Sequence, residues 1–174
     1  KKALAAKDNV NQSTIDNNAT STEIRYLSRV YLALAEGHWT NQSKSGLIDR
    51  PIEKVPECFN RYQVADTGRP SRTEYEVLSE FTYEETPFSL VRLKLQTGRT
   101  HQIRVHMASL SHSLLGDSIY GHEGFLGFDR AALHSFEITC QLPGHQDLAV
   151  FSSEMPEDFQ KMIVESKKLS STLI

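Results

Sequence analysis

The sequence predicts an α+β domain with a mixed, largely antiparallel β-sheet and flanking helices. Several stretches alternate apolar and polar residues with the period of two that is typical of strands, most cleanly at residues 90–96. Only two stretches, one after Thr100 and one after Pro156, repeat apolar residues at helical spacing. Many strands with few helices indicate an α+β architecture.

Each predicted element rests on its own pattern. Residues 29–37 are apolar on both faces, which favours a strand buried on both sides. Ile103, Met107 and Leu110 form one helical stripe, with Thr100 as the expected N-cap. We expect the last helix to begin near Pro156. The other expected strands are 72–81, 90–96, 136–142 and 148–151, and residues 41–68 have no clear periodicity, so a loop is predicted there.

Composition limits the classes of function. No apolar run approaches the roughly 18 residues that span a bilayer, so we expect a cytoplasmic protein without a membrane partner. Cys58 and Cys140 are too few for a disulfide framework or a four-thiolate metal site. The net charge of −3 argues against binding nucleic acid by bulk positive charge, so any such site must be local. Residues 8–22 are polar enough to predict a mobile segment, within a fragmentary N-terminal unit, 1–28, that precedes a domain at 29–174.

The segment with most chemistry lies where the strand at 90–96 turns into the first helix. Arg99, His101, Gln102, Arg104 and His106 crowd this turn, and such a cluster at a helix N-terminus suits an anion or a carboxylate. A solvated polar face is the plainer alternative. The two histidines are five residues apart with no glutamate between them, so no metal site is expected. Phosphate-loop and nucleophile-elbow motifs are absent from the sequence.

A longer motif resembles a known family. TGRTHQIRVHMASLSHSLLGDSIYG, at residues 97–121, closely resembles the motif of the RluA-type RNA pseudouridine synthases. Three more stretches resemble that family in the same order: RVYLALAEG at 29–37, DRPIEK at 49–54 and LHSFEITCQLPG at 133–144. The resemblance covers about residues 29–160 and implies part of the pseudouridine synthase catalytic fold.

The resemblance also implies a reaction and roles for residues. The enzyme would break the N-glycosidic bond of a uridine in ribosomal or transfer RNA, turn the bound uracil and rejoin it through C5, as a monomer and without a cofactor. Tyr31 matches the tyrosine that packs on the uracil and is a candidate for removing the C5 proton. Arg104 matches the arginine that pairs with the catalytic aspartate. Substrate-binding roles fall to Arg99, His101, Gln102 and Ile103.

The sequence departs from the family at several positions. Ser111 and Ser113 stand where the family usually has Gly and Pro, and Arg29 replaces the common Lys. The H-R-L-D motif with the nucleophilic aspartate is absent from the 174 residues. We therefore expect Arg104 to lack its partner and this chain alone to be inactive, with the aspartate upstream of Lys1.

Asp117, in the LLGD turn, is expected to be an exposed-turn or capping residue rather than the nucleophile. A catalytically inactive RNA-binding protein that keeps the fold is the alternative function.

Overall fold

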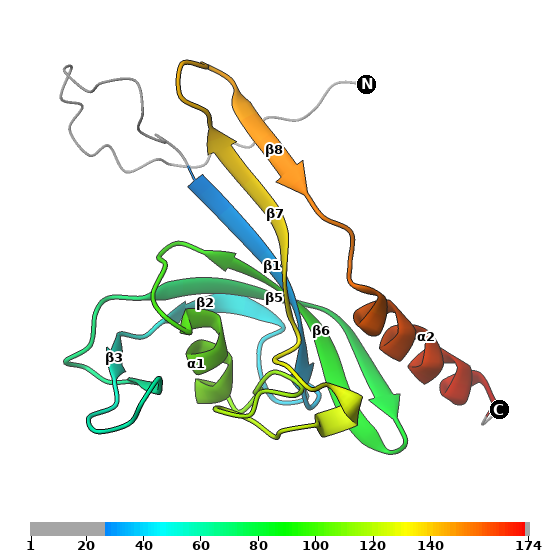
Figure 1. Cartoon of the computed structure of the whole chain (residues 1–174). Helices are drawn as coiled ribbons and strands as arrows, with labels where there is room; N and C mark the ends of the chain where they lie inside the picture. The colour runs from blue at the N-terminus through cyan, green and yellow to red at the C-terminus, as the bar shows by residue number, and fades with distance from the viewer. Residues whose placement is uncertain (1–26, 173–174) are drawn as a thin grey trace.

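The structure, a computed structural model, describes residues 27–172 (Figure 1). The segment predicted to be mobile, 8–22, and nearly all of the unit 1–28 lie outside the described residues. Two α-helices and eight strands make up the described part, and neither helix is long and apolar enough to cross a membrane.

The fold is built on a six-stranded sheet in the order β2-β5-β6-β1-β7-β8 (Figure 1). Every pairing in this sheet is antiparallel, and β3 and β4 form a separate two-stranded hairpin. The strands are β1 (Leu27–Glu36), β2 (Ser45–Asp49), β3 (Ile52–Lys54), β4 (Tyr62–Val64), β5 (Arg72–Tyr83), β6 (Thr86–Leu95), β7 (Leu133–Gln141) and β8 (Leu148–Ser152). The helices are α1 (Gln102–Ser109), the short 3-10 turn η1 (Phe125–Gly127) and α2 (Glu157–Thr172). The predicted α+β class is confirmed.

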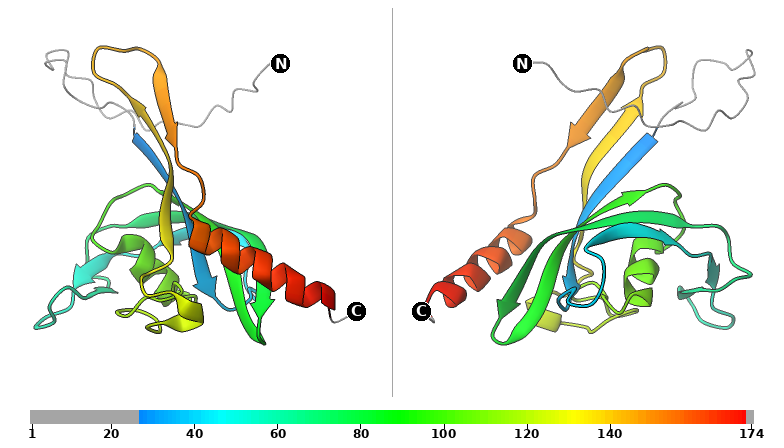
Figure 2. Two further views of the ribbon diagram at one scale, coloured as in Figure 1. Left: turned by 45° about the vertical axis from the view of Figure 1, so that its right-hand side comes forward. Right: turned by 180° about the vertical axis from the view of Figure 1, so that it is seen from behind.

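The central strand β1 is buried on both faces, as its sequence predicts. Leu32 and Leu34 pack in one core with Phe159 of α2. Ala33 and Ala35 point to the opposite face and pack in a second core with Ile103 of α1. The sheet therefore separates the two helices, and the two views of Figure 2 show α1 and α2 lying apart.

Two expectations about local structure are wrong. Residues 41–68, predicted to be a loop, contain β2, β3 and β4. The N-cap of α1 is His101 rather than Thr100, and it has the left-handed φ of 55° without a side-chain capping hydrogen bond. Helix α1 therefore begins one residue later than an N-cap at Thr100 would place it, and the chain turns sharply at His101.

Candidate active site

A cavity of about 230 Å³ opens where β1, the end of β6 and the start of α1 meet. All six residues assigned to the site from the sequence line it, together with two leucines. The lining residues are Tyr31, Leu95, Arg99, His101, Gln102, Ile103, Arg104 and Leu133. The structure thus brings together side chains from four elements, β1, β6, α1 and β7, and from the turn between β6 and α1. The chemical roles assigned to these residues remain predictions.

Tyr31 reaches the cavity from the middle of β1. The pairing of β1 with β7 shifts register between Val30 and Tyr31, and such a bulge turns the following side chain away from its regular direction. Tyr31 pairs directly with Leu93 of β6, which is completely buried. Leu93 and Ile103 belong to the same buried cluster, so they form an apolar floor under this part of the site.

Gln102 fixes the turn that leads into α1. Its side-chain oxygen accepts hydrogen bonds from the Thr97 hydroxyl at 2.8 Å and from the Arg99 backbone N–H at 3.0 Å. Its side-chain nitrogen donates to the carbonyl of Arg72 and to the Thr73 hydroxyl. Because the amide is buried and fully hydrogen-bonded, Gln102 supports the shape of the cavity rather than offering a free group to a substrate.

Arg104 has a carboxylate partner within the chain, Asp117, which is not the nucleophilic aspartate of the family motif. Its Nε donates to Oδ2 of Asp117 at 2.7 Å, and its Nη2 donates to Oδ1 at 2.6 Å. This is the two-pronged geometry in which an arginine binds a carboxylate most strongly. The hydrogen bond with Asp117 raises the pKa of Arg104, so the guanidinium stays charged.

Asp117 is fully buried, so the expectation of an exposed turn residue is wrong. The expected capping role is present, because Oδ1 also accepts the backbone N–H groups of Ile119 and Tyr120, each at 3.0 Å. Burial by itself raises the pKa of this carboxyl, but the hydrogen bonds from Arg104, Tyr120 and Ile119 outweigh burial and lower it. Oδ1 accepts three hydrogen bonds and Oδ2 accepts one, so both oxygens of Asp117 are engaged in holding the arginine and the turn.

Tyr120 ties this pair to the β3–β4 hairpin. Its ring lies under the guanidinium of Arg104, 5.0 Å from ring centre to Cζ. Its hydroxyl oxygen accepts the backbone N–H of Tyr62 in β4 at 2.9 Å and lies 3.0 Å from Nδ1 of His101. Burial and the nearby Arg104 charge lower the pKa of His101, which favours the neutral ring.

Sequence reasoning missed Asp117, Tyr120 and Tyr62 as members of this network. The local signal at Asp117, a common turn in which the aspartate carboxylate caps the N–H groups two and three residues on, predicted the capping role alone. No local pattern pairs Asp117 with Arg104, thirteen residues earlier.

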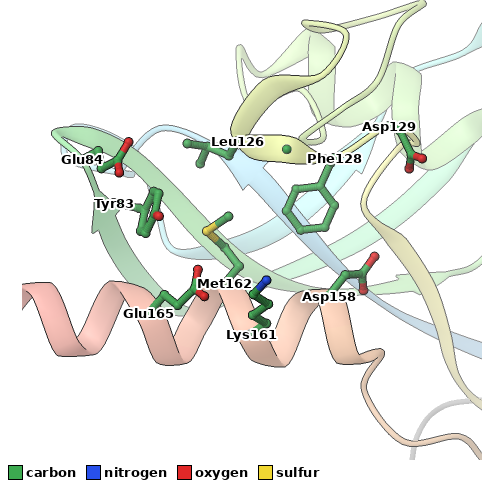
Figure 3. Close-up of a pocket in the computed structure, with 10 residues that line it drawn as sticks. Tyr83, Glu84, Leu126, Phe128, Asp129, Asp158, Lys161, Met162 and Glu165 are labelled. Carbon is green, nitrogen blue, oxygen red and sulfur yellow. The ribbon is translucent and has the colours of Figure 1, made fainter.

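A second and larger hollow, of about 560 Å³, lies between α2 and the β5–β6 hairpin. Figure 3 shows residues of the hairpin and of the segment around η1 facing residues of α2 across it. The hollow contains four carboxylates and one lysine: Glu84, Asp129, Asp158, Glu165 and Lys161. Among the described residues, no three His, Cys, Asp or Glu side chains are grouped closely enough to hold a metal ion. The excess of negative charge makes this hollow a poor site for a phosphodiester backbone.

Comparison with known proteins identifies the family. The family model described as RNA pseudouridylate synthase matches residues 5–109, which include Tyr31 and Arg104. The chain belongs to this family. Pseudouridylate synthases with similar sequences include the ribosomal large subunit pseudouridine synthase D of Nitrosomonas europaea, which is 33% identical over 159 residues. An uncharacterized RNA pseudouridine synthase of Bacillus subtilis is 39% identical over 140 residues.

These alignments cover most of this chain but less than half of either relative. They cover 87% of this chain and 44% of the Nitrosomonas protein, and 80% of this chain and 45% of the Bacillus protein. The chain thus spans about half the length of the curated pseudouridine synthases that it matches. Among solved structures, human RNA pseudouridylate synthase domain containing 1 superposes with a TM-score of 0.57 at 26% identity, covering 80% of this chain and 66% of that one.

A second solved structure supports the fold alone. Human RNA pseudouridylate synthase domain containing 4 superposes with a TM-score of 0.59 at 19% identity, over 81% of this chain and 62% of that one.

Proposed function

We propose that this chain supplies the tyrosine and the arginine that line the active site of an RNA pseudouridine synthase. One observation carries the proposal: Tyr31, the apolar floor at Ile103 and the charged Arg104 line the same cavity. At about 230 Å³ the cavity is somewhat smaller than the roughly 300–1,000 Å³ of pockets for drug-sized ligands, which suits a single pyrimidine base.

In this proposal the target uridine leaves its stack and enters the cavity, because its glycosidic bond is out of reach within a helix. Tyr31 lies against the face of the uracil and takes the C5 proton. The positive charge of Arg104 stabilises the nucleophilic carboxylate in its ionised form. Since both oxygens of Asp117 already hold Arg104 and the turn, we propose that the nucleophile comes from a segment outside these 174 residues.

Arg99 and His101 are proposed to hold the RNA at the mouth of the cavity. Both residues line it, and Arg99 also donates from Nε to the carbonyl of Pro70. The names of several relatives refer to the large ribosomal subunit, so ribosomal RNA is the proposed substrate and transfer RNA the alternative. The protein would then act in the cytoplasm, as a monomer.

An RNA-binding protein without catalysis is the second candidate function. The departures from the family motif at Ser111 and Ser113 and the net charge of −3 favour it. It would use the same cavity to hold a uridine without breaking its glycosidic bond.

Tritium release from RNA that contains 5-tritiated uridine separates these two functions. We expect the complete gene product to release tritium from ribosomal RNA transcripts, and the 174-residue chain alone to release none. A complete gene product that binds the RNA but releases no tritium would support the RNA-binding function. Turnover by the 174-residue chain alone would show that the nucleophile lies within it.

A further inference from the structure

Asp117 lies on a loop that is fixed to the same strand that carries Tyr31. The residue two positions before it, Leu115, donates its backbone N–H to Leu34 of β1 and accepts a hydrogen bond from Ala132. Gly116 has a positive φ of 68°, and a Cβ at this position would come within 2.5 Å of the backbone oxygens of Phe128 and Arg130. The loop therefore cannot shift easily, and it holds the Asp117 carboxylate at a set distance from the cavity.

The contacts of Asp117 leave only part of the Arg104 guanidinium available. A guanidinium has five N–H groups, and Asp117 uses one on Nε and one on Nη2. The ring of Tyr120 covers one face. Within residues 27–172, Nη1 makes no hydrogen bond, and the Arg104 side chain is 18% exposed where it lines the cavity. Any partner must therefore approach the end of the guanidinium, where Nη1 and the second N–H of Nη2 remain.

We propose that Asp117 is a positioning residue that holds the Nε and Nη2 groups of Arg104. Nη1 and the second N–H of Nη2 are then left to bind the reacting carboxylate in the proposed reaction. This inference rests on the proposed function and deepens it. Asp117 lies beyond the residues matched by the family model, 5–109. Its negative charge has a second effect, because Arg104 then serves two carboxylates. The reacting carboxylate has a higher pKa than it would have beside an unpaired arginine.

The test compares Asp117→Asn and Asp117→Glu in the complete gene product. Asn keeps the shape of the side chain but loses the charge and one acceptor oxygen. Glu keeps the charge, but its side chain is longer by one methylene and displaces the guanidinium. For both variants we expect kcat to fall by about 100-fold, the scale of a small misplacement of a reacting group, with KM changed much less. Only Asp117→Asn should move the acidic limb of the plot of kcat against pH to lower pH. It removes a negative charge near the reacting carboxylate, and this loss lowers the pKa of that carboxylate.

The matched control is Asp158→Asn. Asp158 also binds an arginine, Arg130, and also accepts a backbone N–H, that of Phe159, but it lies at the second hollow. This control should leave kcat, KM and the pH profile unchanged. If both Asp117 variants remained folded with kcat within about threefold of wild type, the positioning role would be wrong.

A readout that is independent of activity is the NMR signal of the Arg104 Nε–H in the complete gene product. We expect this proton to be protected from exchange in the wild type and in Asp158→Asn, and to lose its protection in Asp117→Asn. Wild-type protein that makes no pseudouridine would overturn the proposed function, but the Arg104 signal would still decide whether Asp117 fixes the guanidinium. Unchanged protection in Asp117→Asn would overturn the inference whatever the activity.

Discussion

Two arginine–aspartate pairs in this molecule share their chemistry but differ in their surroundings. Arg104 binds Asp117 beside the small cavity, and Arg130 binds Asp158 beside the hollow under α2. Each arginine lies over an aromatic ring, and each aspartate also accepts a backbone N–H. The side chains of the first pair are 18% and 0% exposed, and those of the second are 45% and 41% exposed.

Burial and neighbouring side chains, rather than the pair itself, decide what an arginine–aspartate pair can do. Water screens the exposed pair, which is expected to contribute little to stability. At the first pair, Tyr31 and Ile103 provide apolar surface beside the guanidinium of Arg104, whose Nη1 group can still bind a partner. At the second, Glu165 and Asp129 surround the hollow with further negative charge, as Figure 3 shows. Hollow size alone would select this acidic region rather than the cavity lined by the family motif.

The largest expected effect is on the chemical step. In the complete gene product, Arg104→Met loses both the charge and the planar fork, and Arg104→Lys loses the fork alone. Both should lower the single-turnover rate at saturating enzyme by about 100- to 1,000-fold, the range for removing one preorganised charged donor. RNA affinity should change much less. Lys161→Met, a lost cation at the second hollow, is the control and should leave the rate unchanged.

Affinity measured by filter binding completes this test. A variant of Arg104 that binds RNA poorly but reacts at the normal rate once saturated would show that the arginine contacts phosphate, and the aspartate-pairing role would be wrong.

The two pairs should also differ in their effect on stability. Asp117 is the only carboxylate bound to Arg104 among residues 27–172, and Arg104 is largely buried, so Asp117→Asn should lower the free energy of unfolding by about 3 kcal/mol. Asp158→Asn breaks an exposed pair and should cost less than about 1 kcal/mol. Urea unfolding of the two variants measures both values. Equal losses of unfolding free energy in the two variants would show that burial does not distinguish the two pairs.

The Asp117 contribution should depend on pH. Its pKa in the folded state is lowered from the ordinary value, so the unfolded chain binds a proton at a higher pH than the folded chain does. The stabilisation is complete above the unfolded pKa, roughly 3.9 for aspartate, and is lost as the pH falls through the folded value. Wild type and Asp117→Asn should therefore converge in stability in strong acid.

Arg99 is expected to show a smaller effect of a different kind. If it contacts RNA phosphate, Arg99→Met should weaken binding to all sequences similarly and reduce the slope of log affinity against log salt by about 1. The single-turnover rate at saturating enzyme should stay close to wild type. Lys161→Met serves as the control at the acidic hollow, where a lost cation should leave the salt slope unchanged. A rate loss as large as that of Arg104→Met would place Arg99 in the chemical step.

The sequence was sufficient for the long elements and insufficient for the short strands within residues 41–68. β1, β5 and β6 are ten or more residues long, so their alternation is visible. β3 and β4 have three residues each, too few to reveal a period, and they form because each supplies the other's hydrogen bonds. A pattern of side chains cannot predict such pairing.

The same limit applies to the site. Tyr31 and Arg104 were assigned to the site because the motifs around them resemble those of the family, and the structure places both at one cavity. The Arg104–Asp117 contact was missed because it depends on where the loop after α1 returns to β1. The hydrogen bond from the Leu115 N–H to the Leu34 carbonyl sets that return, and it connects residues about eighty positions apart. Local spacing carries no information about such a contact.

The smallest expected effect concerns this same loop, at Ser111. The residue has a left-handed φ of 65°, which costs a side chain with a Cβ about 1–2 kcal/mol relative to glycine, while glycine loses more backbone entropy on folding. Ser111→Gly should therefore raise the free energy of unfolding by about 0.5–1 kcal/mol. Ser113, the other departure from the family motif, already ties the loop by donating its hydroxyl proton to the carbonyl of Tyr120 at 2.7 Å, so Ser113→Ala should lower stability. Urea midpoints of the two variants measure opposite shifts, and a destabilised Ser111→Gly would mean that the serine stabilises the loop in a way that its backbone angle does not reveal.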